Sequence, residues 1–207
     1  SDVYKRQVVN LLTRFYDIDG GSITLDGESI YDIPKKKLRG SIGIVLQDTV
    51  IFNDTIMQNI RYGRLDATDE EVIAAAKTAK VADFAEKMAD GYDTMLTEGG
   101  GNLSQGQRQL IAIARAVLAD PKILILDEAT SSIDTRTEVH IQEAMLALMK
   151  GRTSLIIAHR LSTIRDADKI VVIDGGKVVE AGNHEKLLSE NGAYARLYNA
   201  QFAGIKT

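Results

Sequence analysis

The segment from Gly99 to Asp134 constrains the fold of this 207-residue chain more than any other part of it. Ser104, with Gln107 three residues later, has the spacing of a capping box at the start of a helix. Apolar residues then recur with the spacing of one buried helical face: Leu110, Ile111, Ala114, Val117 and Leu118. The helix should end before Pro121, because proline disfavours helical geometry at the residue that precedes it.

The second half of this segment predicts a buried strand that ends in two acids. Four aliphatic residues, 123–126, are typical of a strand buried on both faces, and Asp127 and Glu128 follow directly. Ligands of open α/β sheets bind at the carboxyl ends of the strands. Burying two adjacent acids is costly unless a cation or protons compensate the charge. We therefore expect a site in which one acid binds Mg²⁺ and the other polarises a water molecule.

The start of the predicted helix is also suited to bind an anion. Ser104 and Gly106 combine a hydroxyl, free backbone N–H groups and the positive end of a helix dipole. Each piece also has a purely structural explanation, since a capping box and a buried strand occur in any well-packed α/β unit. Only their order and spacing together favour phosphate chemistry.

Five motifs resemble those of ATP-binding-cassette (ABC) nucleotide-binding domains, and they occur along the chain in the order that is usual in that family. Gln47 in GIVLQDTVIF resembles the Q-loop, and residues 123–127 with Glu128 resemble Walker B and the catalytic glutamate. Residues 131–134 resemble the D-loop, and His159 in IIAHRLSTI resembles the switch histidine. The signature motif, with glutamine at its middle position where glycine is more usual, is represented by Leu103, Ser104, Gln105, Gly106 and Gln107. The resemblance extends from about Val8 to the C-terminus.

The resemblance implies an ATPase that uses ATP and Mg²⁺. Asp127 and Gln47 would bind Mg²⁺, Glu128 would be the general base, and His159 would contact the γ-phosphate. The signature residues and Asp134 would face ATP held by a second such domain in a head-to-tail homodimer or heterodimer. Taken alone, Gln47 could be a polar residue at a strand end, His159 a satisfied histidine, and Asp134 a helix cap.

The expected fold class is α/β, with a P-loop NTPase-like (RecA-like) core and a mainly parallel sheet. An inserted helical subdomain and the remnant of an N-terminal antiparallel β-subdomain complete it. We expect a single nucleotide-binding domain over 1–207, in which 8–53 form core and β-subdomain, 54–103 the helical subdomain and 104–207 further core. Expected helices cover 8–15, 34–38, 55–60, 69–80, 81–88, 104–120, 135–150, 185–189 and 193–201; expected strands cover 22–25, 41–46, 123–126, 154–158 and 169–173. A second capping box, from Thr135 to Glu138, should start the helix at 135.

The N-terminus departs from the family pattern. The P-loop G-x-x-x-x-G-K-[ST] should precede the helix at Val8, yet the first glycine of the chain is Gly20. Residues 1–7, SDVYKRQ, stand in its place and are interpreted as non-native; Lys5 has the offset of the P-loop lysine, but no Ser or Thr follows it. Without the strand that leads into a P-loop, we expect unpaired sheet edges, low stability of the isolated chain and weak or absent ATP binding.

Composition excludes several classes of partner and site. The net charge is −4 and the isoelectric point is near 5.4, so no electrostatic footprint for nucleic acid exists. The chain has no cysteine, which excludes disulfides and thiolate zinc sites. No apolar run approaches the roughly 20 residues that cross a bilayer. The two other histidines, His140 and His184, are interpreted as surface residues.

The leading hypothesis is the ATPase domain of a bacterial ABC exporter at the cytoplasmic face of the plasma membrane. Transmembrane domains of the same transporter would lie upstream on the same polypeptide. The alternatives are a soluble ABC-type ATPase of DNA repair or translation, and a non-catalytic partner domain that contributes only its signature helix and D-loop. A soluble ABC-type ATPase would show coiled-coil insertions, tandem cassettes or basic faces, and the sequence contains none of these. The intact Glu128 and His159 argue against a non-catalytic partner domain.

Overall fold

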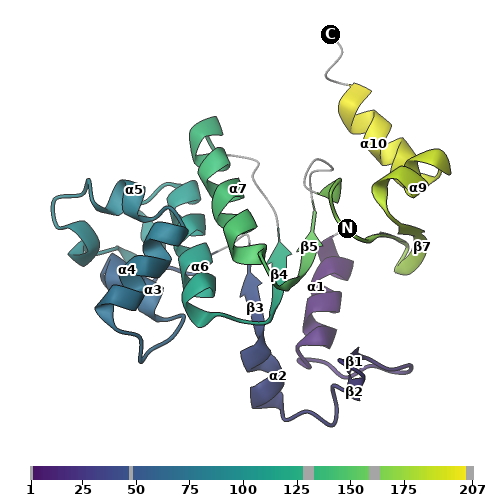
Figure 1. Ribbon diagram of the computed structural model, residues 1–207, viewed down its shortest axis with the longest axis horizontal. Coiled ribbons are helices and arrows are strands. Elements are labelled where there is room, and N and C mark those ends of the chain that lie inside the picture. Colours follow the sequence, from purple (N-terminus) through teal and green to yellow (C-terminus); the bar gives the residue numbers. More distant parts are fainter. Residues whose placement is uncertain (1, 47–48, 128–132, 159–163, 204–207) are drawn as a thin grey trace.

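The computed structural model describes residues 2–46, 49–127, 133–158 and 164–203. A three-stranded sheet lies at the centre of the molecule (Figure 1). A lobe of short helices lies on one side of this sheet, and a β-hairpin with the C-terminal helices lies on the other. Within the described ranges, no helix is both long and apolar enough to cross a bilayer.

The central sheet is parallel, which confirms the predicted fold class. It is formed by β3 (Ile42–Val45), β4 (Ile123–Asp127) and β5 (Thr153–Ile157), in that order. Leu126 of β4 is opposite Val45 of β3 on one side and Ile156 of β5 on the other. This register aligns the carboxyl ends of the three strands along one edge of the sheet.

Two long helices pack beside each other next to this sheet: α6 (Gln105–Ala119) and α7 (Thr135–Met149). Their starts were predicted with different success. The capping box of α6 forms as expected between Ser104 and Gln107. The one predicted at Thr135 is wrong, because Asp134 caps α7 instead. Aspartate is a stronger N-cap than threonine, and Asp134 is one position further out.

The helical lobe contains α3 (Ile56–Arg61), α4 (Asp69–Thr78) and α5 (Ala82–Ala85). Two short 3₁₀ turns, Gly91–Asp93 and Glu98–Gly100, lead from it to α6. Helix α5 is shorter than the expected 81–88, because the residues after it form tighter turns, in which the Met88 N–H donates to the Ala85 carbonyl three residues earlier at 3.1 Å. The apolar residues of the lobe, of α6, α7 and of the sheet form one continuous hydrophobic core.

The N-terminal part consists of α1 (Asp2–Leu12), the hairpin of β1 (Thr24–Leu25) and β2 (Glu28–Ser29), and α2 (Lys35–Ser41). Helix α1 begins six residues before the expected Val8. The β1–β2 hairpin is antiparallel, as the expected β-subdomain requires. Among the described strands β5 pairs with β4 alone, and its Leu155 is 38% exposed.

The C-terminal part consists of β6 (Ile170–Asp174), β7 (Lys177–Gly182), α9 (His184–Ser189) and α10 (Ala193–Ala203). Glu180 of β7 caps α10: its carboxylate accepts hydrogen bonds from the N–H groups of Ala193 and Tyr194, the latter at 2.9 Å. His184 is half-buried with its Nδ1 2.7 Å from the Tyr194 hydroxyl, so its interpretation as a surface residue is wrong.

The Glu180 cap predicts a pH-dependent C-terminal helix. The N–H groups of Tyr194 and Ala193 lower the pKa of Glu180 from its ordinary value of 4.5. Because the folded pKa lies below the unfolded one, the cap stabilises the fold fully above about pH 4.5 and is lost as the pH falls through the folded pKa. The protection of the α10 amides against hydrogen exchange, relative to the intrinsic rate at each pH, should therefore fall in acid, and Glu180→Gln should remove most of this pH dependence. Glu190→Gln is the matched control, because it changes an exposed carboxylate that pairs with Lys186 at 3.7 Å and does not lie at the start of α10.

Helices α6 and α7 approach each other closely at Gly106. A Cβ atom at Gly106 would lie 2.2 Å from the Thr137 methyl carbon, well inside van der Waals contact. We expect Gly106→Ala to destabilise the fold. Overpacking costs about 1–3 kcal/mol, which exceeds the gain of up to about 1 kcal/mol in helix propensity.

Denaturant unfolding of three variants checks this prediction. Adding Thr137→Ser to Gly106→Ala removes the colliding methyl group and should restore much of the lost stability. Gly40→Ala is the control, because a Cβ at Gly40 of α2 meets nothing within 4 Å. Equal unfolding midpoints for Gly106→Ala and the unsubstituted protein would contradict the close packing.

Candidate functional site

The predicted catalytic residues follow, in the sequence, the carboxyl ends of the three strands of the central sheet. Asp127 ends β4 opposite Ile157, the last residue of β5, and is half-buried. Glu128 follows Asp127 directly, Gln47 comes two residues after the end of β3, and His159 two residues after the end of β5. These three residues lie outside the described residues, so their catalytic roles stay predictions.

Asp127 is suited to bind Mg²⁺. Its half-buried carboxylate stands at the strand edge, and Mg²⁺ is usually held by one or two carboxylates together with waters and substrate phosphates. In the described part of the chain, no three acidic or histidine side chains gather into a metal cluster.

Helix α6 presents its capped start to solvent at Ser104. The Ser104 hydroxyl accepts a hydrogen bond from the Gln107 N–H at 3.2 Å, and the Gln107 side chain accepts one from the Ser104 N–H at 2.9 Å. The hydroxyl proton is not used in this cap and can be donated to another acceptor. The N–H groups of Gln105 and Gly106 have no acceptor within the helix. One hydroxyl and two N–H groups can thus bind an oxyanion without breaking the cap.

Leu103 and Gly106 are the buried residues of the segment 103–107. Leu103 belongs to the core, and Gly106 is buried against Thr137 and Ile133 at the start of α7. Packing between helices explains the need for glycine at position 106, so Gly106 can contribute only backbone groups to a ligand.

Asp134 stands at the start of α7, next to the start of α6. It is exposed, and its carboxylate accepts a hydrogen bond from the Thr137 N–H at 3.0 Å. This N–H lowers the pKa of Asp134. Since Gly106 contacts Thr137, the structure brings Asp134 and the segment 103–107 together at two adjacent helix starts. Asp134 is a helix cap, and its exposure leaves its second oxygen accessible.

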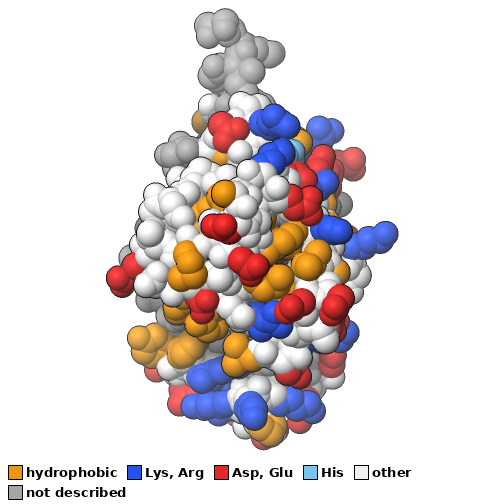
Figure 2. Space-filling view, turned by 90° about the vertical axis from the view of Figure 1, so that its left-hand side faces the viewer, with side chains coloured by type: hydrophobic (Ala, Val, Ile, Leu, Met, Phe, Trp, Pro, Cys, Tyr) orange, Lys and Arg blue, Asp and Glu red, His pale blue; other side chains and the backbone are white. Residues whose placement is uncertain are grey.

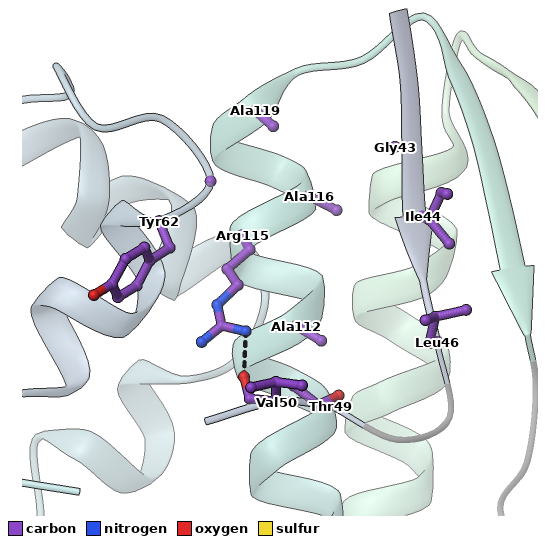
Figure 3. A pocket seen from close by; sticks show the side chains of 11 residues that line it. Gly43, Ile44, Leu46, Thr49, Val50, Tyr62, Ala112, Arg115, Ala116 and Ala119 are labelled. Atoms are coloured by element: carbon purple, nitrogen blue, oxygen red, sulfur yellow. Dashed lines mark hydrogen bonds between the residues drawn. The ribbon is translucent and has the colours of Figure 1, made fainter. Parts of the chain in front are cut away.

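A groove that was not predicted from the sequence lies on the other side of α6 (Figure 3). It has a volume of about 300 Å³ and lies between β3, the segment after it, the end of α3 and α6. Arg115 of α6 points into it and donates a hydrogen bond to the Val50 carbonyl at 2.6 Å (Figure 3). Asn59 of α3, which is fully buried, accepts another from the same guanidinium. The sequence signal for this buried polar contact was Asn59, which lies between Ile56 and Ile60 on an otherwise apolar helical face.

Comparison with known proteins identifies the family. The sequence model of the ABC transporter family matches residues 5–131, more than half of the chain. The chain is 58% identical to an uncharacterized ABC transporter ATP-binding protein, YfiC, of Bacillus subtilis, over 96% of this chain and 33% of that protein. It is 54% identical to an ATP-dependent lipid A-core flippase of Hahella chejuensis, over 96% of this chain and 34% of the flippase.

A solved structure agrees with these relatives. The fold matches a bacterial Atm1-family ABC exporter with ATP bound, with a TM-score of 0.89 and 48% identity, over 97% of this chain and 35% of the exporter chain. The chain thus spans about a third of the length of the proteins it matches. Sequence match, fold and the arrangement of strand ends and helix starts agree, and the chain belongs to the ABC transporter family.

Proposed function

We propose that this chain is part of the ATP-binding and ATP-hydrolysing unit of an ABC exporter, and that residues 1–207 alone, in which no P-loop motif occurs, bind ATP weakly or not at all. The observation that carries the proposal is the register of β3, β4 and β5. It ends three parallel strands along one edge, and Gln47, Glu128 and His159 follow those ends within two positions of the sequence. An ATP-bound exporter of the same fold supports ATP as the nucleotide.

Each residue of this edge has one role in the proposal. Mg²⁺, when bound with ATP, neutralises charge that develops on the phosphates. Asp127 and Gln47 hold it through oxygen atoms, Glu128 accepts a proton from the attacking water, and His159 donates a hydrogen bond to the γ-phosphate. The half-buried position of Asp127 at the strand end supports its part in this arrangement.

A second ABC domain completes the site. In a head-to-tail pair, Leu103, Ser104, Gln105, Gly106 and Gln107 face ATP bound by the partner, and Asp134 contacts the partner domain. The exposed Ser104 hydroxyl with its spare proton supports the first contact, and the exposure of Asp134 supports the second.

The groove beside α6 is the proposed docking surface for transmembrane domains. Four apolar side chains that line it are 36–66% exposed: Ile44, Leu46, Val50 and Tyr62. Figure 2, which looks toward the helical lobe, shows hydrophobic side chains gathered at the surface among acidic and basic ones. One relative is named a fatty acid ABC transporter ATP-binding/permease protein, of Mycobacterium bovis, and is 53% identical over 95% of this chain and 31% of that protein. Its name combines ATP binding with a permease function. In this proposal the unit works at the cytoplasmic face of a bacterial membrane.

Substituting the proposed general base tests the chemistry. We expect Glu128→Gln, in the full-length protein as its gene encodes it, to lower kcat for ATP hydrolysis by about 10²-fold or more, because general-base catalysis contributes factors of that size. ATP binding should persist. Glu185→Gln, which changes an exposed acid of α9, is the control and should leave turnover unchanged. Unchanged turnover in Glu128→Gln would exclude this residue as the base and favour a non-catalytic domain.

Two substitutions of Ser104 separate capping from nucleotide recognition. Ser104→Ala removes the cap and should cost about 1 kcal/mol of stability, whereas Ser104→Asp keeps a side chain that caps equally well. If Ser104 faces a phosphate, Ser104→Asp places a carboxylate against it and should abolish ATP turnover despite normal thermal unfolding. Normal turnover in Ser104→Asp would show that Ser104 acts as a cap alone.

A further inference from the structure

A second pocket lies between the helical lobe and the first turns of α6 and α7, and has a volume of about 370 Å³. Leu110 of α6 lines this pocket, whereas Ala112 lines the groove described above. Two residues along an α-helix turn the side chain by about 200°, so the pocket and the groove lie on opposite sides of α6. The pocket is therefore separate from the surface proposed for the transmembrane domains.

The lining of this pocket is basic, although the chain as a whole is acidic. Lys80, between α4 and α5, and Lys87, after α5, come from the lobe, while Arg136 and His140 come from α7. Among the described residues that line the pocket, Asp83 is the only acid. The whole chain has 25 lysines and arginines and 3 histidines against 29 acids, so four basic side chains to one acid is a local concentration. We call this site the cationic pocket.

Two contacts between charged groups hold the walls of the cationic pocket together. The Lys80 ammonium lies 3.2 Å from the Glu143 carboxylate, and His140 Nδ1 lies 3.8 Å from the Asp83 carboxylate. Both contacts join the lobe to α7, so the pocket is formed before any ligand enters. In the described part of the chain, neither Lys87 nor Arg136 has a carboxylate oxygen within 4 Å. Two cations in the lining are thus available to a ligand.

The stability of α7 does not explain an arginine at position 136. Asp134 is the N-cap of α7, so Arg136 is in its first turn. A positive charge there is unfavourable, because the start of a helix is the positive end of its dipole. Arg136 is also exposed and belongs to no ion pair among the described residues, so it contributes little to the fold. An anion in the pocket would turn this unfavourable charge into a favourable one.

The remaining lining residues define the kind of anion. The Gln107 side-chain oxygen accepts the capping hydrogen bond at the start of α6, which leaves its amide nitrogen as a donor. Arginine and lysine are the usual partners of phosphate groups in proteins. Leu110 is buried and Phe84 half-buried, so they provide an apolar wall beside these donors. A phosphate with a small organic part matches this combination.

We propose that the cationic pocket binds a small soluble phosphate ester, at a site separate from the proposed ATP site. Lys87, Arg136 and Gln107 hold the phosphate, and the organic part lies against Phe84. Its described lining comes from the lobe, α6 and α7 and includes no residue of the central sheet, whose strand ends form the proposed catalytic edge. The bound ester would connect the lobe to α7 in addition to the two contacts between charged groups.

Labelling with pyridoxal 5′-phosphate tests this site in the full-length protein as its gene encodes it. The probe carries a phosphate and an aldehyde, which condenses with a lysine amine to give an imine and water; borohydride then reduces the imine to a stable amine. Peptide mass spectrometry measures the labelled fraction of each lysine. We expect Lys87 to be labelled about 10-fold faster than Lys35, an exposed lysine of α2, because a charge-assisted hydrogen bond contributes a factor of at least about that size. Inorganic pyrophosphate should suppress labelling of Lys87 and leave Lys35 unchanged.

Substitution of Arg136 separates phosphate binding from the intrinsic reactivity of Lys87. Arg136→Gln should lower the labelling rate of Lys87 by about 10-fold, whereas Arg136→Lys, which keeps the charge, should lower it less. Because Arg136 is exposed, both variants should fold normally. Arg196→Gln, which changes an exposed arginine of α10 outside the pocket, is the matched control and should leave labelling unchanged.

Three results would overturn the proposal. They are equal labelling of Lys87 and Lys35, unchanged labelling of Lys87 in Arg136→Gln, and protection of Lys87 by ATP without protection by pyrophosphate. The last result would assign the pocket to the nucleotide of the proposed partner domain. Absence of ATP turnover in the unsubstituted protein would overturn the proposed function and leave this inference standing.

Discussion

The burial of helix α6 is the constraint on which the rest of the structure depends. Its apolar residues share one core with the helical lobe on one side and with β4 and α7 on the other. Because this core fixes the helix, it also fixes what the helix carries at both ends: the capped start at Ser104 and the guanidinium of Arg115 in the groove. Two surfaces with different chemistry are thereby held at a constant separation by one rigid element.

Local patterns in the sequence predicted the elements that depend on neighbouring residues. The capping box at Ser104, the apolar face of α6 and the aliphatic run of β4 are each contained within a few residues, and all form as expected. Where two local signals competed, the prediction failed. Asp134 and Thr135 can both cap a helix, and only the structure shows that Asp134 does.

Long-range features could not be predicted in this way. Arg115 and Asn59 are 56 residues apart, and their hydrogen bonds depend on how α3 packs on α6. The alignment of the strand ends likewise depends on the register of three strands. Gln47, Glu128 and His159 were found by motif, and their roles stay predictions; the structure adds that the strands before them end at one edge.

Asn59 and Arg115, which hold the segment 49–54 by its backbone groups and are called the backbone strap, influence how this surface can evolve. The bonds of the strap reach the carbonyls of Val50, Phe52 and Asp54 and one N–H, so it recognises the path of the segment and none of its side chains. Side chains such as that of Val50 can therefore be exchanged while the strap persists, provided that Arg115 and Asn59 remain. A surface built in this way can be matched to a different partner by substitution at its exposed positions, without redesigning the scaffold beneath.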